Sequence, residues 1–129
     1  MSKEISIQGE WRSGKNVITC NLPLILFEED NNHITYCPAL DISGYGPTES
    51  DANKSFEIAI SEYFRYTVNK KTLVADLKKL GWTIKKHLKR AAIPPSMGEL
   101  LENNEDFNRI FNTHDFRKSS TTINIPAFA

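Results

Sequence analysis

The stretch that decides the fold covers residues 34–48 and reads Ile34-Thr35-Tyr36-Cys37-Pro38-Ala39-Leu40-Asp41-Ile42-Ser43-Gly44-Tyr45-Gly46-Pro47-Thr48. Apolar and polar side chains alternate on both sides of Pro38, which is typical of two short strands joined by a tight reversal. Thr48 stands three residues before Asp51, the spacing at which a threonine side chain caps a helix. The stretch therefore predicts two strands that are followed directly by a helix.

The next segment predicts a long amphipathic helix that packs on the sheet. Its first turn is acidic and its end is basic, in agreement with the helix dipole. Apolar side chains recur at spacings of three and four, at Ala52, Phe56, Ala59, Ile60, Tyr63, Phe64 and Val68.

Two further strands are expected before residue 34. The runs 5–11 and 16–27 are rich in β-forming residues and are separated by the turn signal 12–15, so we expect a β-hairpin over residues 4–22. Pro23 predicts a bulge or an edge position, because proline cannot donate a backbone hydrogen bond. Residues 28–32 form a polar turn, and four short strands thus precede the helix.

The segment after the long helix predicts smaller elements. Thr72 is expected to cap a short second helix, Gly81 to close it in a left-handed conformation, and Trp82 to pack back into the core. A fifth strand with a basic outer face is expected from Trp82 onward. Residues 96–111 predict one or two short helices that begin with a capping box of Ser96 and Glu99, and residues 123–126 predict a strand.

These elements together predict an α+β fold. We expect an antiparallel sheet of about four to five strands with one long amphipathic helix packed across it. The expected organisation is a domain over residues 1–93 with an extra N-terminal hairpin. Residues 94–129 are then a C-terminal extension of short helices and a strand, without a recognisable DNA-binding module.

Composition limits the class of protein. The chain has 129 residues, of which 40% are hydrophobic and 25% charged, with 16 basic and 16 acidic side chains, the profile of one globular domain. The longest apolar run, 22–27, is too short to span a bilayer, and the N-terminus lacks the layout of a secretory signal, so we expect a cytoplasmic protein. Cys20 and Cys37 are expected to be small core residues without a disulfide.

No pattern of catalytic or metal-ligating residues is present in the sequence. His33, His87 and His114 lie far apart, and no Walker lysine or nucleophile elbow occurs. We therefore expect no cofactor, no metal and no enzymatic activity. The least favoured alternative is a metal-dependent nuclease that uses Asp41, the only acid inside an apolar strand segment.

Charge is distributed unevenly along the chain. Residues 1–50 carry three basic and seven acidic side chains (net −4), whereas residues 51–90 carry ten and four (net +6). The basic segment 78–90 supports the main alternative function, an RNA- or DNA-binding regulatory protein. Its candidate contacts are Lys78, Lys79, Lys85, Lys86, Lys89 and Arg90.

The opening stretch and the helix after it resemble the HicB-like antitoxin family. The family pattern is a strand, a Pro-x-Leu turn, a short strand with glycine, Gly-x-Thr, and a helix with an acidic start and an early alanine. The matching positions here are Pro38, Leu40, Gly44, Gly46, Thr48, Asp51 and Ala52. The resemblance covers about a third of the chain and implies a partial ribonuclease-H-like fold without catalysis, in which a helix crosses three antiparallel strands.

The resemblance also implies a partner. HicB-like proteins typically neutralise a small HicA-type toxin, a basic protein that cleaves mRNA, by covering its active surface. An acidic docking surface is therefore expected on this chain, with Glu28, Glu29, Asp30 and Asp41 as its candidate residues. Ala39 stands where the family often has an acid. We also expect a homodimer, because strand edges of the sheet need partners.

Overall fold

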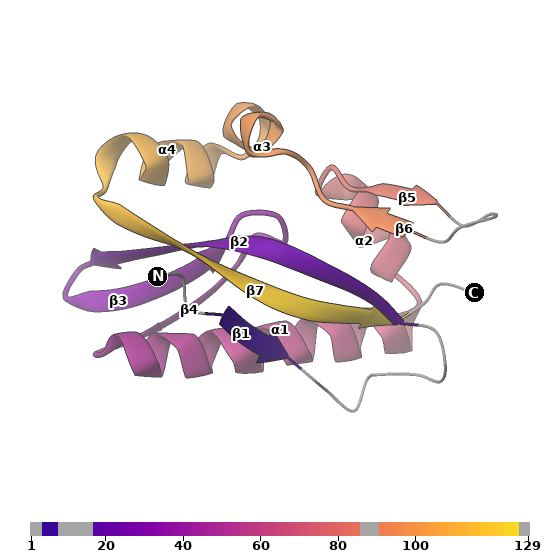
Figure 1. The fold of residues 1–129 in the computed structure, drawn as a ribbon, viewed down its shortest axis with the longest axis horizontal. Coiled ribbons are helices and arrows are strands. Elements are labelled where there is room, and N and C mark those ends of the chain that lie inside the picture. The colour runs from indigo at the N-terminus through magenta and orange to yellow at the C-terminus, as the bar shows by residue number, and fades with distance from the viewer. Residues whose placement is uncertain (1–3, 8–16, 86–90, 127–129) are drawn as a thin grey trace.

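The computed structural model describes residues 4–7, 17–85 and 91–126. It shows an α+β fold with a five-stranded sheet in the order β1-β7-β2-β3-β4 and a small two-stranded sheet of β5 and β6. Along the chain the elements are β1 (Glu4–Ile7), β2 (Val17–Glu29), β3 (Asn32–Cys37), β4 (Ile42–Gly46), α1 (Glu49–Lys70), α2 (Leu73–Lys79), β5 (Thr83–Lys85), β6 (Ala91–Ile93), α3 (Met97–Asn103), α4 (Glu105–Thr113) and β7 (Phe116–Pro126). The predicted fold class is confirmed, with α1 on one side of the large sheet and α3 and α4 on the other (Figure 1).

The strands β2, β3 and β4 form an antiparallel meander. Two residues, Asp30 and Asn31, connect β2 to β3, and their φ angles of 52° and 65° belong to a type I′ hairpin turn. Asp and Asn tolerate this left-handed backbone better than other side-chain-bearing residues do. The turn from β3 to β4 also ends in a left-handed residue, Asp41, with φ of 54°.

Successive residues of the meander face opposite sides of the sheet. The Thr35 hydroxyl donates a 2.7 Å hydrogen bond to Oδ1 of Asn53 in α1, and both side chains are buried. Tyr36 faces the other side, where its ring packs near Phe107 of α4. The sheet therefore has a core on each face, as expected when helices cover both.

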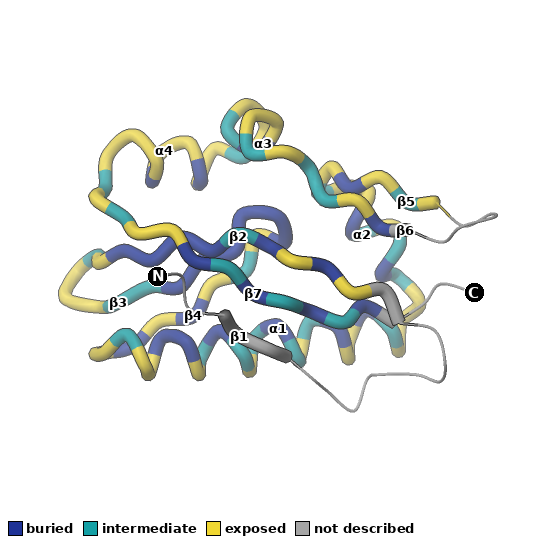
Figure 2. The backbone as a smooth tube through the Cα atoms, in the orientation of Figure 1, coloured by how far each residue is buried: buried dark blue, intermediate teal, exposed yellow. Residues whose placement is uncertain are grey.

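Helix α1 begins and packs as its sequence predicts. Thr48 is the N-cap, and its Oγ1 accepts a 3.1 Å hydrogen bond from the Asp51 backbone N–H. The helix turns its buried residues toward the sheet and its exposed residues away from it (Figure 2). It approaches β4 so closely that a Cβ atom on Gly44 would lie 2.1 Å from the backbone nitrogen of Phe56. Only glycine permits this contact.

The segment after α1 closes one end of the sheet. Thr72 occupies the N-cap position of α2 but makes no side-chain capping bond there, in contrast to its predicted role. Gly81 has φ of 97°, as predicted, and Trp82 is only 4% exposed. The predicted fifth strand exists as β5, but it pairs with β6 in the separate small sheet. That sheet lies beside β2, where the Cys20 thiol donates a 3.6 Å hydrogen bond to the Ala92 carbonyl.

The predicted N-terminal hairpin is wrong. β1 does not pair with β2, because β7 lies between them, parallel to β1 and antiparallel to β2. β7 pairs with β2 in unbroken register from Val17↔Pro126 to Phe27↔Phe116. This long ladder outweighs the local turn signal at residues 12–15, which lie outside the described residues.

Residues after position 93 pack into the same sheet and core as the residues before it. The last strand, β7, is longer than the strand predicted over residues 123–126. It lies inside the large sheet, where Ile123 and Ile125 are fully buried. Phe107 and Ile110 of α4 belong to the same hydrophobic core. The contacts of residues 94–126 thus lie largely with the preceding segment.

Pro23 occupies an edge position without a bulge. It lies opposite Ser120 in the continuous β2–β7 register, whereas the pairing of β2 with β3 begins two residues later, at Ile25. The missing N–H thus falls where β3 has already ended.

Both cysteines are buried free thiols of the core. Among the described helices, none combines the length and apolar character needed to cross a bilayer.

Candidate functional site

The turn between β3 and β4 carries the first candidate residue, Asp41. Within this turn the Leu40 N–H donates a 3.3 Å hydrogen bond to the Cys37 carbonyl, and the side chains of Ala39 and Leu40 are buried. Asp41 follows with its exposed side chain at the surface. Its Oδ1 accepts a 2.6 Å hydrogen bond from the Tyr36 hydroxyl, which fixes the direction of the carboxylate.

Tyr36 connects this turn to the junction of α3 and α4. Its ring is 5% exposed, and its hydroxyl oxygen accepts a 2.9 Å hydrogen bond from Nδ2 of Asn104, the N-cap residue of α4. Burial, followed by the hydrogen bond to Asp41, raises the pKa of the Tyr36 phenol well above its usual range. The phenol therefore remains a neutral donor, and the chain Asn104–Tyr36–Asp41 holds two surface groups in fixed positions.

These two groups border a groove of about 470 Å³, which we call the acidic groove. Four carboxylates and one ammonium line it among the described residues, a formal charge of −3 from four acids minus one lysine. Proline and leucine residues supply the apolar part of its lining. The lining residues are Pro38, Asp41, Lys79, Leu80, Gly81, Pro95, Glu99, Leu100, Asn103, Asn104, Glu105 and Asp106.

The carboxylates of the acidic groove come from three separate elements. Glu99 belongs to the capping box of α3, in which its Oε1 accepts a 3.1 Å hydrogen bond from the Ser96 N–H. The bonds from the backbone and side chain of Ser96 hold the pKa of Glu99 below its usual value. Glu105 and Asp106 form the acidic first turn of α4. A cationic group that enters the groove would meet carboxylates on several sides.

The other three candidate acids lie at the opposite end of β3, in the turn from β2. β3 is six residues long, which separates the two ends by roughly 17 Å. Glu28 is exposed and has His33 Nε2 at 3.5 Å, and Asp30 is exposed in the turn itself. The structure thus brings Glu28, Glu29 and Asp30 together but leaves Asp41 at a different site.

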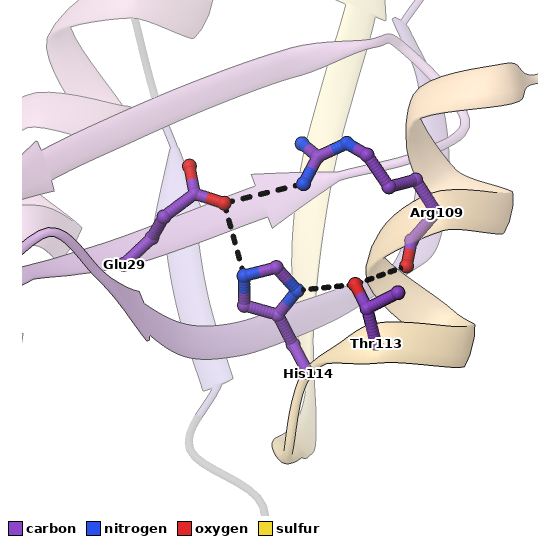
Figure 3. A network of polar contacts seen from close by, with 4 residues as sticks. All are labelled: Glu29, Arg109, Thr113 and His114. Carbon is purple, nitrogen blue, oxygen red and sulfur yellow. Dashed lines mark hydrogen bonds and ion pairs between the residues drawn. The ribbon is translucent and has the colours of Figure 1, made fainter.

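Glu29 takes part in an internal network (Figure 3). Its Oε1 lies 3.2 Å from Nη1 of Arg109 and 2.9 Å from Nε2 of His114. The ring of His114 also packs edge-on against Phe27, at a centroid distance of 5.2 Å. Glu29 therefore joins the β2–β3 turn to the end of α4, and its carboxylate is already occupied in the isolated chain.

The same network contains a hydroxyl, an imidazole and a carboxylate in sequence. Thr113 Oγ1 lies 2.8 Å from Nδ1 of His114, whose Nε2 reaches Glu29. In a nucleophilic site the hydroxyl proton passes to the imidazole. Here the Thr113 hydroxyl donates a 2.6 Å hydrogen bond to the Arg109 carbonyl one turn earlier in α4. This arrangement favours a role in ending the helix and fixing the turn.

A second cavity of about 500 Å³ lies beside this network. Three acids, one arginine and two histidines line it, and the lining includes the ion pair of 2.6 Å between Arg117 and Glu49. The lining residues are Leu26, Phe27, Glu28, His33, Ile34, Thr35, Glu49, Ala52, Thr113, His114, Asp115, Phe116 and Arg117. With three acids and one arginine the formal charge of its lining is −2, smaller in magnitude than the −3 of the acidic groove, so this cavity selects less strongly for a cationic group.

The basic segment is only partly described. Lys78 and Lys79 are exposed in α2, and Lys85 is exposed at the end of β5. Lys79 lines the acidic groove, so it does not contribute to a purely basic face. The candidates Lys86, Lys89 and Arg90 lie outside the described residues.

The sequence names Asp41 as the acid that a metal-dependent nuclease would use, and it spaces His33, His87 and His114 far apart. Within the described ranges, no group of three or more His, Cys, Asp or Glu side chains is arranged to hold a metal ion.

Sequence reasoning missed Glu105, Asp106 and Asn104 as groove residues. The signal that points to them is the pair of consecutive helix starts, at Ser96 and Asn104, which place acidic first turns side by side.

No known protein family, curated protein or solved structure matches the chain.

Proposed function

We propose that the protein is a non-catalytic, HicB-like antitoxin or a stand-alone relative of one, which binds and neutralises a small basic HicA-type toxin that cleaves mRNA. The observation that carries this proposal is the packing of the motif over residues 34–52. Gly44 lies where a Cβ would collide with Phe56, Thr48 caps α1, and Ala52 is fully buried in its first turn. These three motif residues thus cap α1 or let it pack closely on the antiparallel strands.

The acidic groove is the docking site that this proposal favours. Pro38 and Asp41 of the motif line it, together with three further carboxylates from α3 and α4. A basic partner would gain both steering and specificity from this concentration of negative charge. The turn over Glu28 and Asp30 offers a smaller acidic surface, because Glu29 is engaged with Arg109 and His114.

The alternative function is nucleic-acid binding through the basic segment 78–90. Lys78 and Lys85 support it, because both are exposed on adjoining elements, α2 and β5. Such binding would weaken steeply as salt concentration rises. The two functions are therefore separable by salt dependence and by nuclease treatment.

Affinity capture from a native lysate tests the proposal. We expect a small basic protein to be retained at moderate salt in nuclease-treated and untreated halves alike. The purified partner should cleave mRNA, and stoichiometric addition of the chain should stop the cleavage. Capture of nucleic acid alone, in the untreated half only, would instead favour the basic segment.

Two matched variants locate the surface. Glu105→Gln with Asp106→Asn removes two charges from the acidic groove, and Glu57→Gln with Glu102→Gln removes two charges outside it. We expect the first pair to weaken binding at least tenfold and the second pair to leave it unchanged. Equal effects of the two pairs would show that net charge, and not the groove, attracts the partner.

A further inference from the structure

The side of α1 that points away from the sheet carries two large exposed apolar residues. Ile58 is 66% exposed and Tyr66 is 62% exposed, while an ion pair of 3.3 Å joins Glu62 to Arg65 between them. Exposed positions recur along this side of the helix over its whole length (Figure 2). We call Ile58, Glu62, Arg65 and Tyr66 together the outer face of α1.

The neighbouring edge of the sheet is protected against strand pairing. β4 is an edge strand, and the Tyr45 N–H that points outward from it donates a 3.2 Å hydrogen bond to the Ser55 hydroxyl of α1. A second chain that added a strand here would have to break this bond and pass the side of the helix. Self-association at this end of the sheet is therefore favoured through the helix and not through the β4 edge.

We propose that the outer face of α1 binds the same face of a second copy of this chain, with the two helices antiparallel about a two-fold axis at Glu62. Ile58 and Tyr66 lie four residues on either side of Glu62, about 6 Å along the helix axis in each direction. An antiparallel two-fold therefore places Ile58 of each chain against Tyr66 of the other. The face is self-complementary, as an isologous interface requires.

The charges of α1 fit the same arrangement. Near the axis, Arg65 of each chain comes within reach of both Glu62 carboxylates, so the like-charged pair of glutamates is neutralised by two guanidinium groups. Farther out, Asp51 in the acidic first turn of one chain approaches Lys70 at the basic end of the other, whereas Glu49 faces the sheet side and pairs with Arg117. A parallel arrangement would instead bring like charges together along the whole helix.

The interface is small. A single pair of helices buries less surface than the roughly 1,200 Å² that stable complexes bury, so the dimer forms reversibly at high protein concentration. It leaves the acidic groove open, because α3 and α4 lie on the opposite side of the sheet from α1 (Figure 1). Dimerisation and partner binding are thus separate properties, and loss of one does not predict loss of the other.

Sedimentation velocity over a series of concentrations tests the proposal. We expect the wild-type weight-average mass to rise from monomer toward dimer as concentration increases. Ile58→Lys with Tyr66→Ser should remain monomeric, with unchanged circular dichroism. Tyr45→Ser, which alters a tyrosine of similar exposure outside this face, should dimerise normally. A wild-type chain that stays monomeric, or a Ile58→Lys, Tyr66→Ser chain that still dimerises, overturns the proposal.

A charge exchange tests the antiparallel geometry. Glu62→Arg places four positive charges around the axis of its own dimer, and Arg65→Glu places four negative charges there, so each variant alone should associate at least tenfold more weakly. An equimolar mixture of the two should recover association as a heterodimer. If the mixture associates no better than its components, the two-fold axis at Glu62 is wrong.

Discussion

The indole nitrogen of Trp82 donates a 2.8 Å hydrogen bond to the carbonyl of Ala39, 43 residues earlier in the chain. This bond joins the segment after α2 to the turn between β3 and β4, so it also supports one wall of the acidic groove. Both residues are buried, so water does not reach the Ala39 carbonyl to take the place of the indole N–H if that donor is removed.

Replacement of Trp82 by phenylalanine tests this connection. The Trp82→Phe variant keeps an aromatic ring in the core but leaves the Ala39 carbonyl without its donor. We expect the free energy of unfolding to fall by about 1–3 kcal/mol, the cost of an unsatisfied buried acceptor. Urea denaturation followed by circular dichroism measures the change, and an unchanged midpoint would contradict the role of this bond.

Gly44→Ala tests the close approach of α1 to β4. The added methyl would lie 2.1 Å from the Phe56 nitrogen, and backbone atoms cannot move aside as a flexible side chain can. We expect a loss of at least about 3 kcal/mol or failure to fold. The control is Gly98→Ala in α3, where no atom lies within 4 Å, and this change should stabilise by up to about 1 kcal/mol. Thermal unfolding distinguishes the two.

Glu29→Gln tests the network at the β2–β3 turn. The variant loses the charge that faces Arg109 and His114, and these groups are partly exposed, so we expect a loss of only about 0.5–1 kcal/mol at low salt. The loss should shrink as salt is added. Glu28→Gln, at a side chain that is 72% exposed, is the matched control and should change the free energy of unfolding less. A larger effect at Glu28 would contradict the assignment.

Tyr36→Phe tests the fixed geometry of the acidic groove. Removal of the hydroxyl abolishes the bonds to Asp41 and Asn104, and we expect a destabilisation of about 1–2 kcal/mol. Backbone amide resonances of Asp41 and Asn104 should shift, whereas those of the distant β2–β3 turn should not. Resonance shifts confined to the site of substitution would mean that the groove does not depend on this hydroxyl.

The two cysteines predict a dependence of stability on alkaline pH. Burial raises the pKa of Cys20 to about 11 and that of Cys37 to about 12. An unfolded thiol ionises near pH 8.5, so the unfolded state releases protons first, and the stabilisation present below that pH is lost as pH rises toward the folded values. Denaturation midpoints should decline between about pH 8.5 and pH 11.

Thiol reactivity gives an independent measurement of the same burial. Because the thiolate is the reactive form, both cysteines should resist iodoacetamide at neutral pH in the folded chain and react fully in denaturant. A Cys20→Ser, Cys37→Ser variant is the control for the pH dependence, and its stability should decline less over the same range. Rapid alkylation of the native protein would contradict the burial of the thiols.

The meander and α1 could be predicted from sequence because their determinants are local. Thr48 and Asp51 signal the start of the helix, and the spacing of Phe56, Ile60 and Phe64 gives its buried side. The position of β7 could not be predicted in this way. Pairing of Ile123 with Cys20 depends on two segments that are distant in sequence, and neither carries a mark that identifies the other.

The candidate site was predicted less well, for a related reason. The sequence marks Asp41 as a lone acid in an apolar segment, and the structure places it in the turn between β3 and β4. The other carboxylates of the groove lie in the first turns of α3 and α4, where acidic residues are expected for helix capping and for the helix dipole alone. Glu99 is an example, since its bond to Ser96 is a purely local interaction. Only the path of the chain around Pro95 brings Glu99 and Asp41 to the same groove.

The place of β7 between β1 and β2 has a consequence for how the chain folds during synthesis. β2 can complete its ladder only after residues 116–126 have left the ribosome, because Thr19 lies opposite Asn124, 105 residues later. Until then the edge of β2 that pairs with β7 is unpaired, and apolar side chains of β2 lie next to this open edge. Slow closure of this non-local pairing should limit the folding rate, and the nascent chain is an expected substrate for chaperones that bind exposed strands.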